Sequence, residues 1–484
     1  MNFARRVISG VGWGAATTAG TMVLRTVQMV LIARMLPPGE MGLYALANLA
    51  LNFVGVFADA GLTQAIVARR VTSRAVLSSV CWTNLVVSAT AAAAIVVAAP
   101  ALAHLQGEPR LEAPLAWSAV TFVCFAATQP FLSLLQRELD FRATGLAELI
   151  GATVGAVGAV AMVHEGLGVM GLVFGQVLYA AVRGFVLWFY GRHLFSPDLH
   201  WRFGETWPFL RLGLYQMGDR VIGFVNARLD QLLIGSIAGA EALGIYALAW
   251  SLVVEPIYRL NPIVTNVAFP ALAHKQDDKA ALQRGFLLMT RALTTINAPI
   301  MLGIAATAPV CVPVLLGPEW QSAIPLMQVL AMVGLARGIL NPTGALVAAV
   351  GRPDLSFRWT TRQSLIQLPL LAVALASFGL MPAAICLAVF TLGLIPFIYR
   401  GMVVPILGPI GGEYLGSMLP AVGMGLAMAI MVDTIAEMAL PLAGTELFAV
   451  QVVCGAAFYA VGMLLLRPDD ARFLRGLVGP KGAR

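Results

Sequence analysis

Long apolar runs recur throughout this chain of 484 residues and restrict its possible folds more than any other feature. Each run is about 20 residues or longer, the length that lets an α-helix cross roughly 30 Å of hydrocarbon. The runs are 8–34, 41–65, 76–100, 113–135, 143–163, 167–190, 208–237, 242–268, 285–309, 322–349, 359–378, 381–399, 414–434 and 446–466. We therefore expect an all-α integral membrane protein with about 14 transmembrane helices.

Charged residues are scarce, which agrees with this expectation. They make up 11% of the chain, whereas a soluble domain carries roughly 25%. The composition excludes a soluble enzyme, a disordered chain and a protein that binds nucleic acid through a water-facing basic surface. The 5 cysteines stand in or beside apolar runs without paired spacing, so the sequence suggests neither disulfides nor a zinc site. We expect no metal site and no cofactor.

The basic residues of the loops indicate how the chain crosses the membrane. Lysine and arginine collect in cytoplasmic loops, and alternating spans place every second loop on the same side. With the N-terminus inside, the inner loops and tail hold 20 basic residues, and the outer loops hold only Arg34 and Arg110. We expect both termini to be cytoplasmic. The loops are also too short for a catalytic domain outside the membrane, so we expect no enzyme.

Two segments share a pattern at a distance of 202 residues. GLYALA at 42–47 recurs as GIYALA at 244–249, and each copy follows a short outer turn and opens an even-numbered span. An even shift preserves orientation, so the copies are parallel repeats about an axis along the membrane normal. We expect two six-helix lobes, 1–195 and 205–403, around a central cavity, with two further spans and a cytoplasmic tail at 404–484.

Arginines stand within the expected spans, and lysines do not. Arg183, Arg211 and Arg362 are close to span ends, where a long side chain reaches the interface. Six others stand deeper, where a charge costs about 2.5 kcal/mol or more and usually faces a bundle interior or an aqueous cavity. Guanidinium stays charged and binds phosphate or carboxylate oxygens through a planar fork. The expected anion-binding residues are Arg25, Arg220, Arg228, Arg259, Arg291 and Arg337.

Acidic residues within the spans are fewer than the arginines. Those well inside are Asp59, Glu148, Asp219, Asp230 and Glu255. A cavity with more cation than anion suits an anionic ligand. The candidates for coupling transport to H⁺ or Na⁺ are Asp59, Asp219, Asp230 and Glu255. Two alternatives stay open, because Glu255 and Arg259 have the i,i+4 spacing of an internal ion pair and Asp59 also suits helix packing.

Residue spacing predicts which helix faces are polar and which pack closely. The first span carries a single polar stripe at Thr18, Thr21, Arg25 and Gln28, whose spacings of three, four and three place them on one face. Two glycine pairs, at 151 and 155 and at 171 and 175, have the small-xxx-small spacing that lets helix backbones approach. We expect close helix contacts at both pairs.

Several local sequences, in this order along the chain, match a known family. They are ARML at 33–36, GLY at 42–44, DAGL at 59–62, RELDF at 137–141, NPI at 261–263, AFP at 268–270 and LLGPEW at 315–320. With the span pattern, the chain resembles the polysaccharide transporter family, the Wzx-type lipid-linked oligosaccharide flippases. This family belongs to the multidrug/oligosaccharidyl-lipid/polysaccharide flippase superfamily, and the chain is most similar to its fourteen-span colanic-acid type.

The resemblance implies a substrate and a location. The substrate is an undecaprenyl-diphosphate-linked oligosaccharide repeat unit, moved between the leaflets of a bacterial inner membrane with basic cavity residues on the diphosphate. Its partners are membrane lipid and the polysaccharide polymerase or export machinery. One rival is an ion-coupled multidrug antiporter of the same superfamily, but cationic drugs would favour acidic residues. A second is a membrane glycosyltransferase or polymerase, which tends to have a large outer loop.

Overall fold

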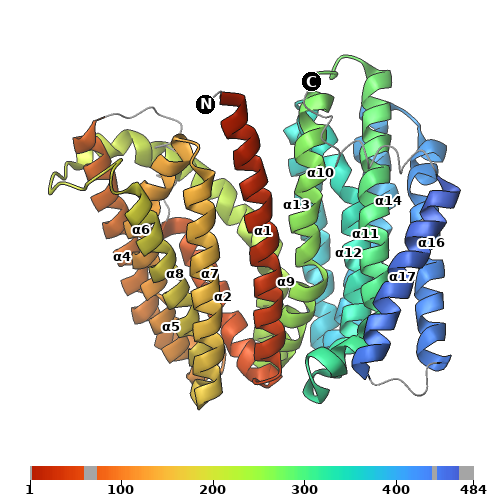
Figure 1. Ribbon diagram of the computed structural model, residues 1–484, viewed down its shortest axis with the longest axis horizontal. Coiled ribbons are helices and arrows are strands. Elements are labelled where there is room, and N and C mark those ends of the chain that lie inside the picture. The colour runs from red at the N-terminus through yellow and green to blue at the C-terminus, as the bar shows by residue number, and fades with distance from the viewer. Residues whose placement is uncertain (1–2, 59–72, 439–443, 468–484) are drawn as a thin grey trace. The chain divides into compact units, whose positions relative to one another are not determined.

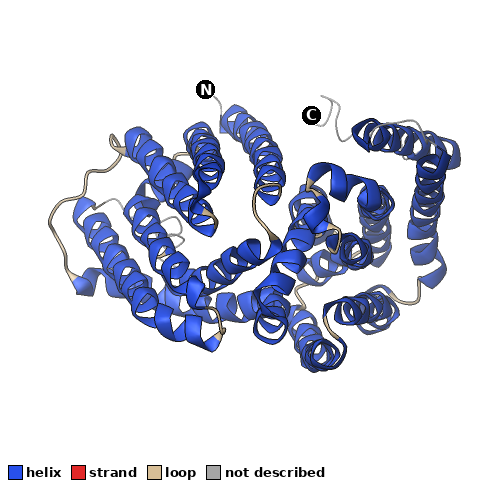
Figure 2. Cartoon of the chain, turned by 90° about the horizontal axis from the view of Figure 1, so that it is seen from below, coloured by secondary structure: helices blue, strands red, loops and turns tan. Residues whose placement is uncertain are grey.

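The computed structural model describes residues 3–58, 73–438 and 444–467. Within these ranges the secondary structure consists of helices joined by loops and turns, with no strand (Figure 2). The all-α prediction is therefore confirmed. The chain divides into two compact units, residues 1–245 and 246–484, and each is described by itself.

The first unit contains the N-terminal helices, whose long members run alongside one another (Figure 1). They are α1 (Phe3–Ala33), α2 (Pro38–Ala58), α4 (Arg74–Leu105), α5 (Glu112–Ser118), α6 (Val120–Arg137), α7 (Phe141–Met162), α8 (Val169–Gly191) and most of α9 (Phe203–Val253). A 3₁₀ turn at Pro109–Leu111 precedes α5, and a π-helical turn at Val163–Leu167 follows α7. The core joins α4, α6, α7 and α8 through buried residues such as Val80, Leu135 and Leu187.

The second unit contains the remaining helices. They are α10 (Glu255–Ala273), α11 (Lys279–Leu315), α12 (Ala323–Ala349), α13 (Pro353–Phe378), α14 (Leu380–Ile398), α15 (Val404–Leu407), α16 (Gly411–Met438) and α17 (Gly444–Leu466). A 3₁₀ turn at Pro318–Trp320 and a π-helical turn at Tyr399–Val403 separate some of them. The long helix α11 packs against α12, α16 and α17.

A proline in α11 fixes one contact with α17. Pro299 has no N–H, so the carbonyl oxygen of Thr295, one turn earlier, loses its helical donor. The hydroxyl of Tyr459 on α17 donates to that oxygen at 3.0 Å. In hydrocarbon an unsatisfied carbonyl is costly, so this hydrogen bond both compensates the proline and attaches the C-terminal helix to the unit.

The expected spans coincide with helices. In the described part of the chain, 11 helical segments are long and apolar enough to cross a membrane. The other expected spans fall on α2, α13 and the first part of α9. Gly239, with φ 84°, interrupts α9 between the expected spans 208–237 and 242–268, and Gly379, with φ 86°, separates α13 from α14. Left-handed backbone favours glycine, so both breaks have a local cause.

Many apolar side chains point outward from these helices. Val97 on α4 is 80% exposed, Val157 on α7 is 63% exposed and Leu465 on α17 is 78% exposed. Such exposure in water would promote aggregation, whereas lipid tails are as apolar as these side chains. The exposed residues therefore mark helix faces suited to contact with lipid.

The glycines that open the two copies of the sequence repeat both belong to the first unit, and both are closely packed. A Cβ at Gly42 would collide with the carbonyl group of Ala240, and a Cβ at Gly244 would collide with the carbonyl oxygen of Pro38. The shift of 202 residues maps Pro38 onto Ala240 and Gly42 onto Gly244. Each copy thus places its glycine against the same backbone position of the other, as two copies related by a two-fold axis would.

Candidate functional site

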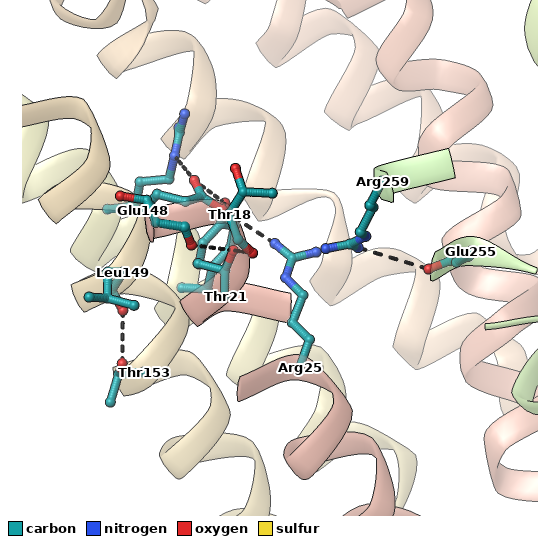
Figure 3. A network of polar contacts seen from close by, with 11 residues as sticks. Thr18, Thr21, Arg25, Glu148, Leu149, Thr153, Glu255 and Arg259 are labelled. Carbon is teal, nitrogen blue, oxygen red and sulfur yellow. Dashed lines mark hydrogen bonds and ion pairs between the residues drawn. The ribbon is translucent and has the colours of Figure 1, made fainter. Parts of the chain in front are cut away.

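Arg25, a member of the first span's polar stripe, contacts another helix through its side chain (Figure 3). The hydroxyls of Thr18 and Thr21 donate to carbonyl oxygens of their own helix, those of Gly14 and Thr17, at 2.8 and 2.9 Å. The Nη2 atom of Arg25 instead lies 3.4 Å from Oε1 of Glu148 on α7. The stripe therefore contributes one guanidinium to a contact between α1 and α7.

Glu148 binds further donors from α8. The Nε atom of Arg183 donates to its Oε2 at 2.9 Å, and the hydroxyl oxygen of Tyr179 lies 2.9 Å from both carboxylate oxygens. We name Arg25, Glu148, Tyr179 and Arg183 the Glu148 cluster. Its side chains differ in exposure: Arg183 is 15% exposed, Glu148 is 29% exposed and Arg25 is 49% exposed.

Glycines bring α7 and α8 close enough to build this cluster. A Cβ at Gly151, one turn after Glu148, would approach the Cβ of Arg183 to 2.8 Å. A Cβ at Gly155 would approach the Cβ of Tyr179 to 2.6 Å and the carbonyl oxygen of Gly175 to 2.9 Å. The predicted close approach at these glycines is present, and it sets the register in which Tyr179 and Arg183, four residues apart, both reach Glu148.

Aromatic rings support the two arginines of the Glu148 cluster. The guanidinium carbon of Arg183 lies 5.6 Å from the ring centre of Phe125 on α6, and that of Arg25 lies 5.8 Å from the ring centre of Tyr179. A ring face attracts a cation without neutralising it. Two guanidinium groups and one carboxylate leave the cluster with one net positive charge, so it attracts anions.

The second unit holds one of its arginines, Arg337, in a different way. The guanidinium carbon of Arg337 on α12 lies 4.7 Å from the ring centre of Trp250, and its Nη1 donates to the hydroxyl of Tyr258. Trp250 in turn stacks on Tyr246 with ring centres 5.6 Å apart. We name Trp250, Tyr258 and Arg337 the Arg337 cluster. Trp250 and Tyr258 are uncharged, so they leave the positive charge of this arginine intact.

Glu255 and Arg259 of α10 form the ion pair that their spacing allows (Figure 3). The carboxylate oxygen and the guanidinium nitrogen lie 3.9 Å apart, at the upper limit for an ion pair, and both side chains are about one-third exposed. The internal pairing left open by the sequence is therefore present. Its length and exposure make it a weak interaction.

The remaining candidates are scattered. Arg228 on α9 donates to Oε1 of Gln231 at 3.3 Å, and the buried Asp230 accepts the backbone N–H of Gln231 at 2.9 Å. Arg291 is half-buried on α11. Asp59 lies outside the described residues, as do the side chains of Asp219 and Arg220. Within the described ranges, no three His, Cys, Asp or Glu side chains are grouped as a metal site requires.

Sequence reasoning placed Arg25 among the site residues but not the other three members of the Glu148 cluster, although Glu148 stood among the acids well inside the spans. Arg183 was expected to reach the interface, but it is largely buried and paired with Glu148. Tyr179 did not stand out because it is uncharged, and the site residues were selected among the charged residues of the spans. The useful signal was the spacing of Tyr179 and Arg183 on a helix with close-packing glycines, which places two donors opposite a carboxylate on the neighbouring helix.

Comparisons with known proteins agree with these features. A family model described as "Polysaccharide biosynthesis protein" matches residues 31–325. The lipopolysaccharide biosynthesis protein WzxC of Escherichia coli is 30% identical over 425 residues, 86% of this chain and 85% of WzxC. The succinoglycan biosynthesis transport protein ExoT of Rhizobium meliloti is 27% identical over 496 residues, 99% of this chain and 98% of ExoT.

The fold is similar to that of solved transporters. The lipid II flippase MurJ in an inward closed conformation superposes with a TM-score of 0.75 at 13% identity, covering 94% of this chain and 98% of MurJ. An inward-facing multidrug resistance transporter of the MATE family superposes with a TM-score of 0.54 at 17% identity, covering 82% and 95%. The chain belongs to the polysaccharide transporter family of flippases within the MOP superfamily.

Proposed function

We propose that this chain moves an undecaprenyl-diphosphate-linked oligosaccharide repeat unit from the inner to the outer leaflet of the bacterial cytoplasmic membrane. The product would serve exopolysaccharide, capsule or O-antigen synthesis. Family membership makes the chain a transporter and not an enzyme. The names of its relatives, which concern lipopolysaccharide and succinoglycan, support a sugar-containing cargo.

The observation that carries this proposal is the net positive charge of the Glu148 cluster on helices that suit a membrane. A diphosphate needs charged donors to replace its hydration when it leaves water, and guanidinium supplies two such donors in a plane. Arg25 is half exposed, so its donors are accessible to a ligand. Arg337 offers a second charge, which its neutral partners Trp250 and Tyr258 leave intact.

The proposed mechanism is alternating access by the two lobes, 1–195 and 205–403, with residues 404–484 added to them. The anionic head group enters an arginine-lined central cavity while the polyprenyl tail stays in lipid. Movement of the lobes then exposes the head group to the other side. Both termini lie in the cytoplasm in this scheme, because the basic loops then face inward.

An ion gradient drives this cycle in our proposal. The coupling candidates are Asp59, Asp219, Asp230 and Glu255, with H⁺ or Na⁺ as the ion. Asp230 is 7% exposed, and charges interact more strongly in such surroundings than in water, so protonation or a bound cation at this carboxylate would be felt by nearby charged groups. Glu255 already has a weak partner in Arg259, which a bound ion would replace.

The rival functions fit the charges less well. A multidrug antiporter of the same superfamily would bring a cationic substrate against Arg25 and Arg337, and like charges repel.

The polysaccharide polymerase or export machinery is proposed as a partner that uses the flipped substrate. A polymerase activity of this chain itself would disagree with the family to which it belongs.

Reconstitution tests the proposal. Vesicles containing the purified chain and a fluorescent lipid-linked oligosaccharide report transfer between leaflets through the accessibility of the label. We expect Arg25→Ala to lower the initial rate about tenfold, because a charge-assisted hydrogen bond of roughly 1.5–3 kcal/mol is lost. Arg352→Ala is the matched control, since Arg352 is exposed and paired with Asp354 outside the expected spans.

Two results would contradict the proposal. One is a parent-like transfer rate in both Arg25→Ala and Arg337→Ala. That result would exclude these two arginines as ligands of the head group. The other is export of a cationic dye by the parent chain with no transfer of the lipid-linked oligosaccharide. The latter result would favour the multidrug antiporter.

A further inference from the structure

One carboxylate holds the two arginines of the Glu148 cluster unequally. The bond from Nε of Arg183 to Glu148 is 2.9 Å long, whereas the contact from Nη2 of Arg25 is 3.4 Å long. Arg183 is 15% exposed and Arg25 is 49% exposed. The shorter bond is thus the more buried one, and the longer contact is the one that water and ligands reach.

The two contacts also differ in what their loss would leave behind. Without Arg25, Glu148 keeps the guanidinium of Arg183 and the hydroxyl of Tyr179, so its charge stays compensated. Without Arg183, the carboxylate would depend on a longer and more exposed contact. Removing one partner of a buried charge is the costly event, so Arg183 is the permanent partner and Arg25 the exchangeable one.

The ring of Tyr179 contacts Arg25 independently of the carboxylate of Glu148. The guanidinium carbon of Arg25 lies 5.8 Å from the ring centre of Tyr179, and a ring face attracts a cation independently of Glu148. Tyr179 therefore contacts Glu148 through its hydroxyl and Arg25 through its ring. This arrangement keeps Arg25 close to its original position while its donors turn to another anion.

We propose that Glu148 is a positioning residue that occupies Arg25 in the empty transporter and releases it to the anionic head group of the substrate. This inference rests on the proposed function. The head-group phosphate and the carboxylate compete for the same guanidinium donors. Competition lowers the affinity for substrate and speeds its release, because Glu148 takes Arg25 back as the phosphate departs. Arg183 and Tyr179 hold Glu148 in place throughout.

The variant Glu148→Gln separates this role from a structural one. Glutamine keeps the shape and an oxygen for Tyr179 and Arg183, but it removes the charge that competes for Arg25. We expect the half-saturating concentration of lipid-linked oligosaccharide to fall about three- to tenfold, and the maximal rate to fall by a similar factor because release slows. A residue with a structural role alone would not lower both quantities together.

Glu40→Gln is the matched control. Glu40 also pairs with an arginine of the first unit, Arg110, and its other oxygen accepts the backbone N–H of Val169 at 2.9 Å. It does not belong to the Glu148 cluster, so both kinetic quantities should stay at parent values. In an Arg25→Ala background, Glu148→Gln should no longer lower the half-saturating concentration, because no competition for Arg25 remains.

Binding of inorganic pyrophosphate tests the exchange without transport. Titration calorimetry on the full chain in detergent should show Glu148→Gln binding pyrophosphate about three- to tenfold more tightly than the parent. Equal or weaker binding by a variant with parent-like thermal unfolding would overturn the exchange. A parent chain that binds pyrophosphate in this way but moves no lipid-linked oligosaccharide would overturn the proposed function and leave the exchange intact.

Discussion

The Glu148 cluster of the first unit and the Arg337 cluster of the second unit use different chemistry to hold an arginine within apolar helices. In the first unit, Arg25 and Arg183 share the carboxylate of Glu148, which neutralises about half of their charge. In the second unit, Arg337 is held by the ring of Trp250 and the hydroxyl of Tyr258, which neutralise none of it. A carboxylate stabilises a charge but weakens its attraction for an external anion, whereas a ring leaves that attraction intact.

The largest effect on stability should come from removing the buried partner in the first unit. Arg183→Gln leaves Glu148 with its weaker partner, so we expect the free energy of unfolding to fall by about 2 kcal/mol. Thermal unfolding in detergent measures this change. The double variant Arg183→Gln with Glu148→Gln should recover most of the loss, because no unpaired charge remains. Equal instability of single and double variants would show that packing and not charge is responsible.

Arg337→Gln should lower the transfer rate strongly while changing the free energy of unfolding little. Its partners Trp250 and Tyr258 are uncharged, so the variant leaves neither of them with an unpaired charge and stability should change by less than about 1 kcal/mol. Transfer of the lipid-linked oligosaccharide should fall about tenfold, because a fully retained positive charge is lost. Arg337→Lys keeps the charge but not the planar fork, so its transfer rate should lie between those of the parent and of Arg337→Gln. A large loss of stability would place Arg337 with the carboxylate-held arginines.

Glu255→Gln tests the weak pair of the second unit. The contact with Arg259 is 3.9 Å long and one-third exposed, so we expect stability to change by no more than about 0.5 kcal/mol. If Glu255 couples transport to an ion, the variant should lose the dependence of transfer on an imposed gradient. Glu40→Gln should retain it. A variant that responds to the gradient as the parent does would exclude Glu255 as the coupling residue.

Sequence reasoning reached the helices because hydrophobic length and glycine positions are local properties. The breaks at Gly239 and Gly379 lie between expected spans, and the i,i+4 pair of Glu255 and Arg259 depends on residues close together in the sequence. Fold and family therefore followed from residue patterns.

The sharing of Glu148 was not predictable in the same way. It requires α1, α7 and α8 to meet in one register, and the register follows from contacts such as that of Gly151 with Arg183. The contact of Arg337 with Trp250 likewise joins residues far apart in the sequence. Long-range packing selected these partners, and a single sequence does not reveal such packing.

Among the arginine–carboxylate pairs, one that lies outside the expected spans should contribute least to the free energy of unfolding. Arg352 donates to both carboxylate oxygens of Asp354 at 2.9 and 3.0 Å, and these hydrogen bonds lower the pKa of Asp354 below its ordinary value. Both side chains are about half exposed, so solvent screens the pair. The free energy of unfolding should therefore depend on this carboxylate far less than on Glu148.

The pH dependence of Asp354→Asn follows from the sign of that shift. A carboxylate with a lowered pKa in the folded chain stabilises it above the pKa of the unfolded chain, about 4, and this contribution disappears as the pH falls through the folded pKa. We expect the variant to melt slightly below the parent at pH 7 and together with it near pH 2. In the Arg352→Ala background the difference at pH 7 should shrink. If Asp354→Asn lowered the free energy of unfolding as much as Arg183→Gln does, exposure would not determine how strongly an arginine–carboxylate pair stabilises the chain. The contrast between carboxylate-held and ring-held charges would then lose its physical basis.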